Sequence, residues 1–231
     1  RDAQESRGLG DVYKRQDEDI GSREVIRNAR ELVWYPSEVD TSIRTGWFYH
    51  PEEDTDVRTA DELLDIYLDA VGANASLLLN IPPDTHGRIA AADCASLAEL
   101  GAKIQQIFAS NVTEKAAITA DSAIAQHPIT QAVDGMADTY WQAAYGQEFD
   151  TITLKFPKPQ KVSCVVLGEH LPTGQRIESG EIWADGSKAA EFTVVGHKRI
   201  CRFTPVDVQT LTIKITASRT EPTLRLLEVY Q

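Results

Sequence analysis

The hydrophobic periodicity of this 231-residue chain changes near Ser110, and this change most constrains its fold. Before Ser110, apolar runs alternate with amphipathic helical patterns. After Ser110, short strand-like runs follow one another, separated by Gly, Pro and Asp-Gly turns. Alternating strands and helices are typical of parallel α/β folds, whereas closely spaced strands with turn residues between them are typical of antiparallel sandwiches. The sequence therefore predicts an α/β part followed by an all-β part.

The first part contains two strand–helix units between residues 17 and 109. Residues 32–43 are predicted as a strand, and the apolar run 77–81 is predicted as a second strand that is buried on both faces. Thr59 and Glu62 form a capping box ahead of one helix, and a second helix ends near Phe108. The order strand, helix, strand, helix is the repeat of a parallel barrel, and two such units are too few to close one.

The second part, residues 110–231, is predicted as an antiparallel β-sandwich. Its turn residues include Pro157 and Pro205, which we expect to separate neighbouring strands. The predicted strands are residues 151–156, 161–167, 177–184, 191–195, 198–203, 211–216 and 224–230.

Residues 34–50 concentrate aromatic and ionisable side chains. This stretch contains two Trp, two Tyr, a Phe, two carboxylates, an Arg and a His. Aromatic faces cover the apolar C–H faces of a sugar, and charged groups bind its hydroxyls and move protons. The alternative is a half-buried strand with an aromatic belt. The residue types alone leave both interpretations open.

Residues 38–44 (Glu-Val-Asp-Thr-Ser-Ile-Arg) and 46–50 (Gly-Trp-Phe-Tyr-His) resemble the late-barrel signature of α-L-fucosidases of glycoside hydrolase family 29. The resemblance continues through residues 63–67, 71–72 and 77–84, and Thr45 departs from it because the family usually has Pro there. It implies that residues 17–109 are the C-terminal portion of a (β/α)8-type catalytic barrel. The implied activity is retaining hydrolysis of terminal α-linked fucose from glycans, with no cofactor required.

The resemblance also implies roles for the aromatic stretch, which should lie at the carboxyl ends of the barrel strands. Trp47 is expected to contact the C5 methyl of fucose, or else to pack between loop and barrel. Glu38 is expected to line the pocket first and to act as acid/base second. The nucleophile would lie upstream of Asp17, so we expect this chain by itself to be inactive. The complete set of expected substrate-binding residues is Trp47, Glu38, Asp40, Arg44, Tyr49 and His50.

Two of these residues have specific alternatives. Arg44 either binds sugar hydroxyls or holds Glu38 or Asp40 in an ion pair. His50 either lines the pocket, with Tyr49, or is a structural hydrogen-bonding group.

Residues 132–141 (Ala-Val-Asp-Gly-Met-Ala-Asp-Thr-Tyr-Trp) and 227–230 (Leu-Glu-Val-Tyr) resemble discoidin-like, galactose-binding-like sandwiches, a fold that includes carbohydrate-binding modules. The resemblance implies a structural Ca²⁺, or else ordinary turn chemistry. The expected calcium ligands are Asp134, Asp138, Thr139 and Glu228. The sandwich either binds glycans as a module without catalysis of its own, through aromatics such as Trp183, Tyr145 and His170, or only braces the barrel. We favour the brace, because the linker after Phe108 is short.

Charge and the chain ends set further expectations. The formal net charge of −12 disfavours nucleic acid as a partner, because phosphate backbones would repel the chain. No apolar run reaches transmembrane length, so a fucosylated oligosaccharide or glycoconjugate is the expected partner rather than a membrane. The family resemblance implies a periplasmic or extracellular location.

Residues 1–16 show neither periodicity nor a cap and are interpreted as a non-native tail, with a genuine polar tail as the alternative. Cys164 and Cys201 either pair or are simply buried.

Overall fold

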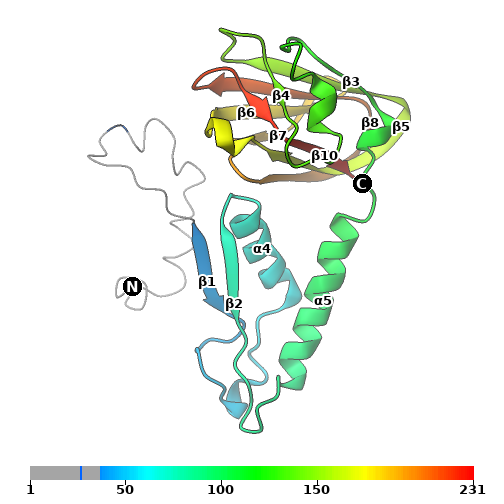
Figure 1. Cartoon of the computed structure of the whole chain (residues 1–231). Coiled ribbons are helices and arrows are strands. Elements are labelled where there is room, and N and C mark those ends of the chain that lie inside the picture. Colours follow the sequence, from blue (N-terminus) through cyan, green and yellow to red (C-terminus); the bar gives the residue numbers. More distant parts are fainter. Residues whose placement is uncertain (1–26, 28–36) are drawn as a thin grey trace. The chain divides into compact units, whose positions relative to one another are not determined.

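The computed structural model describes residue 27 and residues 37–231 (Figure 1). The described residues form two compact units, the first ending at Ile107 and the second beginning at Phe108. The predicted tail, residues 1–16, lies outside the described residues.

The first unit is a parallel strand pair with two helices. Strand β1 (Glu38–Ser42) pairs with β2 (Ser76–Asn80), and the connection between them contains η1 (Pro51–Glu53) and helix α4 (Ala60–Val71). Helix α5 (Ala91–Ile107) follows β2. A parallel pair requires such a crossover connection, so the predicted alternation of strands and helices is confirmed.

Helix α4 begins at the predicted capping box. The Thr59 hydroxyl accepts a hydrogen bond from the Glu62 backbone N–H at 3.3 Å, and the Glu62 carboxylate accepts one from the Thr59 backbone N–H at 2.8 Å. These bonds satisfy backbone donors that a helix start leaves without partners, and they lower the pKa of Glu62. Helix α4 therefore starts where the sequence predicts.

The two faces of the β1–β2 pair differ in character. Ile43, immediately after β1, is buried with Leu63 and Ile66 of α4 and Leu100 of α5 in one apolar cluster. Side chains alternate along a strand, so the opposite face of the pair carries the other set of residues. That set is Glu38, Asp40 and Ser42 of β1 with Ser76, Leu78 and Asn80 of β2. One face of the pair is therefore apolar and covered by helices, and the other is mostly polar.

The second unit consists of antiparallel sheets. The larger sheet has the strand order β10-β5-β8-β6-β7, with β3 also paired to β5, and the smaller sheet pairs β4 with β9. The strands are β3 (Ala117–Ala120), β4 (Trp141–Gln142), β5 (Asp150–Gly168), β6 (Ile177–Ala184), β7 (Ser187–Phe192), β8 (Arg199–Ser218), β9 (Thr223–Leu224) and β10 (Leu226–Tyr230).

Strands β5 and β8 are longer than the sequence predicts. Pro157 and Pro205 were expected to end strands, yet both lie inside these two. The β5–β8 register shifts between Lys155 and Gln160, around Pro157, and again opposite Pro205. Proline is tolerated within a sheet at such bulges, where its missing N–H interrupts no regular ladder bond. The prediction of four separate strands was therefore wrong.

Both sheets contribute to one apolar core. Trp141 of β4, Leu224 of β9, Ile152 of β5 and Leu211 of β8 are fully buried in the same cluster. The Trp141 indole N–H donates to the Ser122 carbonyl at 3.0 Å, which satisfies its one polar group. The two sheets are thus held together mainly by apolar burial.

The three cysteines are free. Cys201 lies opposite Val165 and belongs to the apolar core, whereas Cys164, one residue before Val165, does not. Successive side chains of a strand point to opposite faces, so Cys164 and Cys201 point away from each other. The alternative that they form a disulfide is therefore contradicted, and simple burial holds. No helix in the described part of the chain is long and apolar enough to cross a membrane.

Candidate sugar-binding loop

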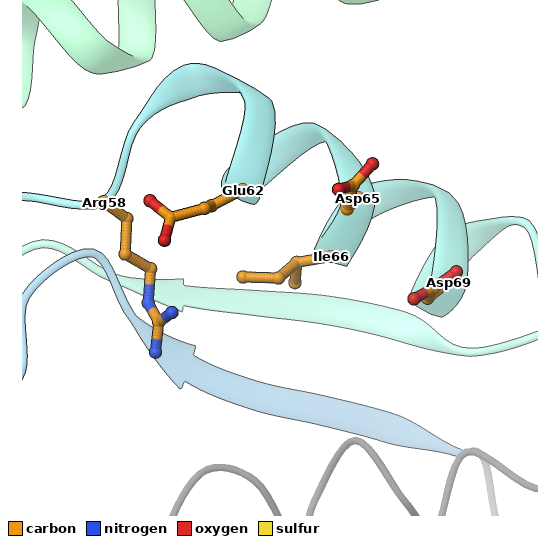
Figure 2. A pocket seen from close by; sticks show the side chains of 5 residues that line it. All are labelled: Arg58, Glu62, Asp65, Ile66 and Asp69. Atoms are coloured by element: carbon orange, nitrogen blue, oxygen red, sulfur yellow. The ribbon is translucent and has the colours of Figure 1, made fainter.

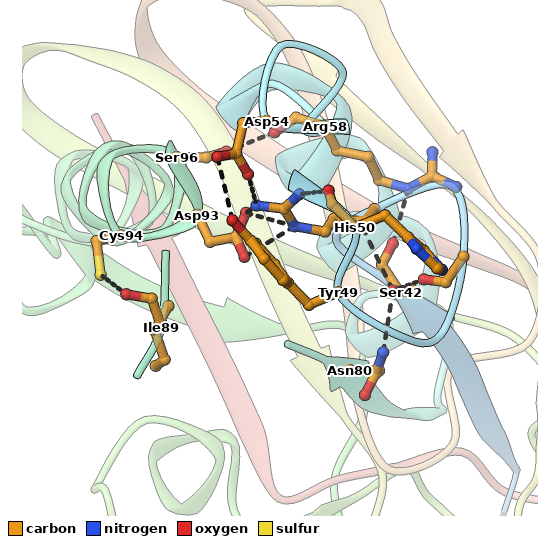
Figure 3. A network of polar contacts seen from close by, with 12 residues as sticks. Ser42, Tyr49, His50, Asp54, Arg58, Asn80, Ile89, Asp93, Cys94 and Ser96 are labelled. Carbon is orange, nitrogen blue, oxygen red and sulfur yellow. Dashed lines mark hydrogen bonds and ion pairs between the residues drawn. The ribbon is translucent and has the colours of Figure 1, made fainter. Parts of the chain in front are cut away.

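The loop after β1 presents two exposed aromatic rings. Trp47 is 47% exposed and Phe48 is 78% exposed. Their backbone is tied to both strand ends. Asn80 Nδ2 donates to Ser42 Oγ at 3.1 Å (Figure 3) and to the Trp47 carbonyl at 3.0 Å. Ser42 Oγ in turn donates to the Gly46 carbonyl at 2.8 Å. The rings therefore project from a fixed backbone at the carboxyl ends of two parallel strands.

Arg44 anchors the same loop from the inside. Its Nε donates to both carboxylate oxygens of Asp93 at 3.1 Å, its Nη2 donates to Asp54 Oδ1 at 2.7 Å, and its Nη1 donates to the His50 carbonyl at 3.3 Å (Figure 3). The Arg44 and Asp93 side chains are both 0% exposed. Burial alone would lower the pKa of Arg44, but the hydrogen bonds and charges of Asp93 and Asp54 raise it. The guanidinium therefore links three segments. These are the end of β1, the start of α5 and the loop that follows β1.

Tyr49 completes this arrangement. The Arg44 guanidinium carbon lies 4.8 Å from the centre of the Tyr49 ring, and the Tyr49 hydroxyl donates to Asp54 Oδ2 at 3.3 Å. Burial, followed by the charge of Asp54, raises the pKa of Tyr49. Tyr49 therefore contributes to the ion-pair cluster, and in these contacts it does not act as a free sugar-stacking ring.

The structure corrects two expectations for the ionisable residues. Arg44 pairs with Asp93 and Asp54, not with Glu38 or Asp40. Its Nε, Nη1 and Nη2 donate within the protein and its side chain is fully buried, so Arg44 does not reach sugar hydroxyls in this arrangement.

Glu38 lies at the opposite end of β1 from the aromatic loop. It is the first residue of the strand and is exposed, and Ser42, the last, lies four residues on, about 13 Å away along an extended chain. The strand itself separates Glu38 from Trp47, so the expectation that all of residues 38–50 lie at the carboxyl end was wrong. Asp40 lies between these ends, and its Oδ1 is buried without a hydrogen-bond partner among the described residues.

His50 reaches the site mainly through its backbone, whose carbonyl accepts from Arg44. Its side chain is 54% exposed, with Nδ1 4.0 Å from Glu52 Oε1. Sequence reasoning missed Asn80, Asp54 and Asp93. Asn80 could have been found as a polar residue that ends an apolar strand, whereas the 49-residue separation of Asp93 from Arg44 gives no local signal.

A pocket of about 220 Å³ on the first unit is separate from these aromatic rings (Figure 2). It is lined by Arg58, Glu62, Asp65, Ile66 and Asp69. Arg58 Nε donates to the Ser42 carbonyl at 2.9 Å, and Glu62 caps α4. Both groups are thus engaged in holding the fold, and the pocket offers no aromatic face for a sugar.

The expected calcium ligands do not form one group. Thr139 Oγ1 donates to both oxygens of Asp134, at 2.9 and 2.7 Å, within one turn. Glu228 lies far along the chain, on β10. In the part of the chain that the structure describes, no three His, Cys, Asp or Glu side chains gather to hold a metal, so Asp134, Asp138 and Glu228 do not act together. A structural Ca²⁺ in the second unit itself stays a prediction.

Two of the three aromatics expected as a sugar platform in the second unit have partners within the protein, and the third is exposed. The Lys214 ammonium lies 4.0 Å from the Trp183 ring centre, and the Trp183 indole N–H donates to Glu181 at 2.8 Å. His170 stacks on Tyr140. Tyr145 is 77% exposed. Lys214 therefore covers one face of the Trp183 ring, and Tyr140 covers one face of the His170 ring.

A family model and a curated relative both match this chain to α-L-fucosidases. A sequence model described as alpha-L-fucosidase matches residues 5–106, a match that begins inside the stretch interpreted as a non-native tail. Alpha-L-fucosidase 1 of Arabidopsis thaliana is 32% identical over 209 residues, which are 85% of this chain and 41% of that protein.

Solved structures agree over both units. A GH29 fucosidase of Ruminococcus gnavus in complex with fucose has a TM-score of 0.80 at 27% identity, over 87% of this chain and 42% of that one. The structure named SpGH29 has a TM-score of 0.81 at 28% identity, over 88% of this chain and 46% of that one. The chain thus spans less than half the length of these relatives. Residues 5–106 thus match the α-L-fucosidase family, and the chain is similar to members of glycoside hydrolase family 29.

Proposed function

We propose that residues 37–107 form strand–helix units of the (β/α)8 catalytic barrel of an α-L-fucosidase. A parallel strand pair with helices on one face and polar residues on the other is what a barrel segment requires, because barrel strands turn one face to the helices and the other to the interior. The polar residues Asp40, Ser42 and Asn80 occupy that second face. We further propose that the second unit is a discoidin-like β-sandwich, since two antiparallel sheets share its core.

The substrate of this site is terminal α-linked fucose of a glycan, and Trp47 is the residue that contacts it. The exposed Trp47 ring at the carboxyl end of β1 carries the proposal, because active sites of such barrels lie at this end and fucose has an apolar methyl group suited to an aromatic face. Asn80 and Arg44 act as positioning residues that fix the loop. Glu38 is assigned no catalytic role, because it lies at the other end of the strand.

A hybrid enzyme tests this proposal. Residues 37–231 would replace the matching part of the Arabidopsis relative, and release of nitrophenol from nitrophenyl α-L-fucoside would be measured. We expect hydrolysis, and we expect Trp47→Ala to raise KM about fivefold, since packing one methyl group on the ring contributes about 1 kcal/mol. Trp183→Phe, in the second unit, is the matched control and should leave KM unchanged. A folded hybrid whose KM is insensitive to Trp47→Ala would overturn the assignment of Trp47.

A further inference from the structure

Three rings stack at the ends of the strands in the second unit. His127 and Tyr140 have ring centres 3.9 Å apart and 20° between their planes, and Tyr140 and His170 have centres 3.8 Å apart and 9° between their planes. Tyr140 immediately precedes β4, and His170 follows the end of β5. The His127 carbonyl accepts from the Gln142 backbone N–H at 3.1 Å, which ties its loop to β4. The stack is therefore held by several elements.

His170 presents one ring nitrogen for binding. Its Nδ1 is buried and has no hydrogen-bond partner among the described residues. Its Nε2 does not combine these two properties. A buried nitrogen without an acceptor favours the neutral tautomer that carries its proton on the other nitrogen. Nε2–H is therefore the donor that remains available to a ligand.

Arg225 supplies an uncompensated positive charge nearby. Its Nη2 lies 3.3 Å from the position that a Cβ on Gly168 would occupy, so the guanidinium packs against the backbone just before His170. The Arg225 side chain is half-buried and makes no hydrogen bond or ion pair with the described residues. A half-buried guanidinium without a carboxylate is unusual in a chain of net charge −12.

The charges around His170 come from several elements. Burial lowers its pKa most, His127, Arg176 and Arg225 lower it further, and only Asp138 raises it. Glu169, the adjacent carboxylate, accepts from the backbone N–H groups of Arg176, Ile177 and Gly196, and its charge acts on Arg176. Of the two arginines, Arg176 donates to the Thr173 and Glu221 carbonyls, whereas the Arg225 side chain makes no bond among the described residues.

We propose that Arg225 and the Nε2–H of His170 form an oxyanion-binding site that takes a sulfate or carboxylate group. The guanidinium offers two parallel N–H donors that match such a group, and the ring stack holds the imidazole in place. This site is in the second unit and is distinct from the Trp47 loop. It gives the sandwich a binding role of its own.

Binding should depend on pH with a defined sign. A bound anion favours protonated His170, so the His170 pKa rises on binding and the protein takes up a proton. Affinity should therefore increase as the pH falls from 7.5 to 5.5, by at most about tenfold for each pKa unit gained. Asp138 opposes the anion directly and limits this gain.

The test is a titration of the whole chain followed by long-range ¹H–¹⁵N NMR of the histidine rings. Sodium sulfate, galactose 6-sulfate, galacturonate and galactose would be added at constant ionic strength. We expect the anionic probes to shift the His170 signals saturably and neutral galactose to leave them unchanged. A response to inorganic sulfate alone would identify a free-anion site, and a response to the anionic sugars would identify a site for acidic glycans.

Three variants make the result decisive. Arg225→Gln should weaken binding at least about tenfold, the loss expected for a hydrogen bond to a charged group, and Arg225→Lys should restore part of it. Arg202→Gln, at an exposed arginine on β8, should change nothing. Because the Arg225 side chain makes no internal bond among the described residues, these variants should fold, which the unchanged spectrum of the core would verify. Equal affinity in Arg225→Gln, or an equal response to galactose, would overturn the proposal.

Discussion

Replacing Asp93 with Asn should selectively loosen the loop that carries Trp47. The change keeps the shape of the side chain but leaves the fully buried Arg44 cation without its main counter-charge. Removing one partner of a buried ion pair costs about 3–5 kcal/mol. Asp54, which is 44% exposed, continues to pair with Arg44 at 2.7 Å, so we expect a cost near the lower limit, about 3 kcal/mol.

Native-state hydrogen exchange is the appropriate assay, because a chain of two units need not unfold in one step. A cost of about 3 kcal/mol corresponds to exchange that is roughly a hundredfold faster at the protected amides between β1 and α4. Asp61→Asn is the matched control, since it removes an exposed 2.9 Å pair with Lys103. That pair should contribute less than about 1 kcal/mol. If Asp93→Asn and Asp61→Asn had equally small effects, the assignment of Arg44 as the anchor of the loop would be refuted.

Three further predictions concern other parts of the chain. Glu169→Gln should destabilise the second unit by about 1–3 kcal/mol in urea unfolding, because the amide replaces one acceptor for a backbone N–H. Burial raises the pKa of Glu169, so its contribution to stability should fall as the pH rises through the raised value, and this dependence should be absent in the variant. A thiol reagent should label exposed Cys94 rapidly but Cys164 only after unfolding, because burial raises the pKa of Cys164 to about 12. Thr59→Ala should cost α4 about 1 kcal/mol, measured by thermal unfolding, and unchanged stability would contradict the capping box.

Local patterns predicted the elements better than their contacts. The Thr59–Glu62 box predicted the start of α4 and the apolar run 77–81 predicted the position of β2, because both signals lie within a few residues. The expectation that this strand is buried on both faces was wrong for the described residues, since Leu78 is exposed on the face away from the helices. The strand end predicted at Pro157 was wrong, because a proline can lie inside a strand where a bulge accommodates it. Whether such a bulge forms depends on the neighbouring strand. The partners of a buried charge are also set by tertiary packing, so Asp93 could not be assigned to Arg44 from the sequence.

The same reasoning explains the outcome for the candidate site. The sequence predicted a strand that runs into a loop, and Trp47 and Phe48 do lie exposed beyond the end of β1. That these rings contact a sugar stays a prediction. Glu38 was wrongly grouped with that loop, because nearness in sequence was taken for nearness in space. An extended strand lengthens by about 3.3 Å per residue, which separates its two ends.

Saturation-transfer NMR of L-fucose with the 231-residue chain tests the central claim most directly. We predict that saturation passes most strongly to the fucose methyl protons, that Trp47→Ala abolishes this transfer, and that Trp183→Phe leaves it unchanged. L-galactose, which has a hydroxymethyl group in place of the methyl, should show weaker transfer at that position. Methyl saturation that persists in Trp47→Ala would show that fucose does not bind at this loop and would contradict the account.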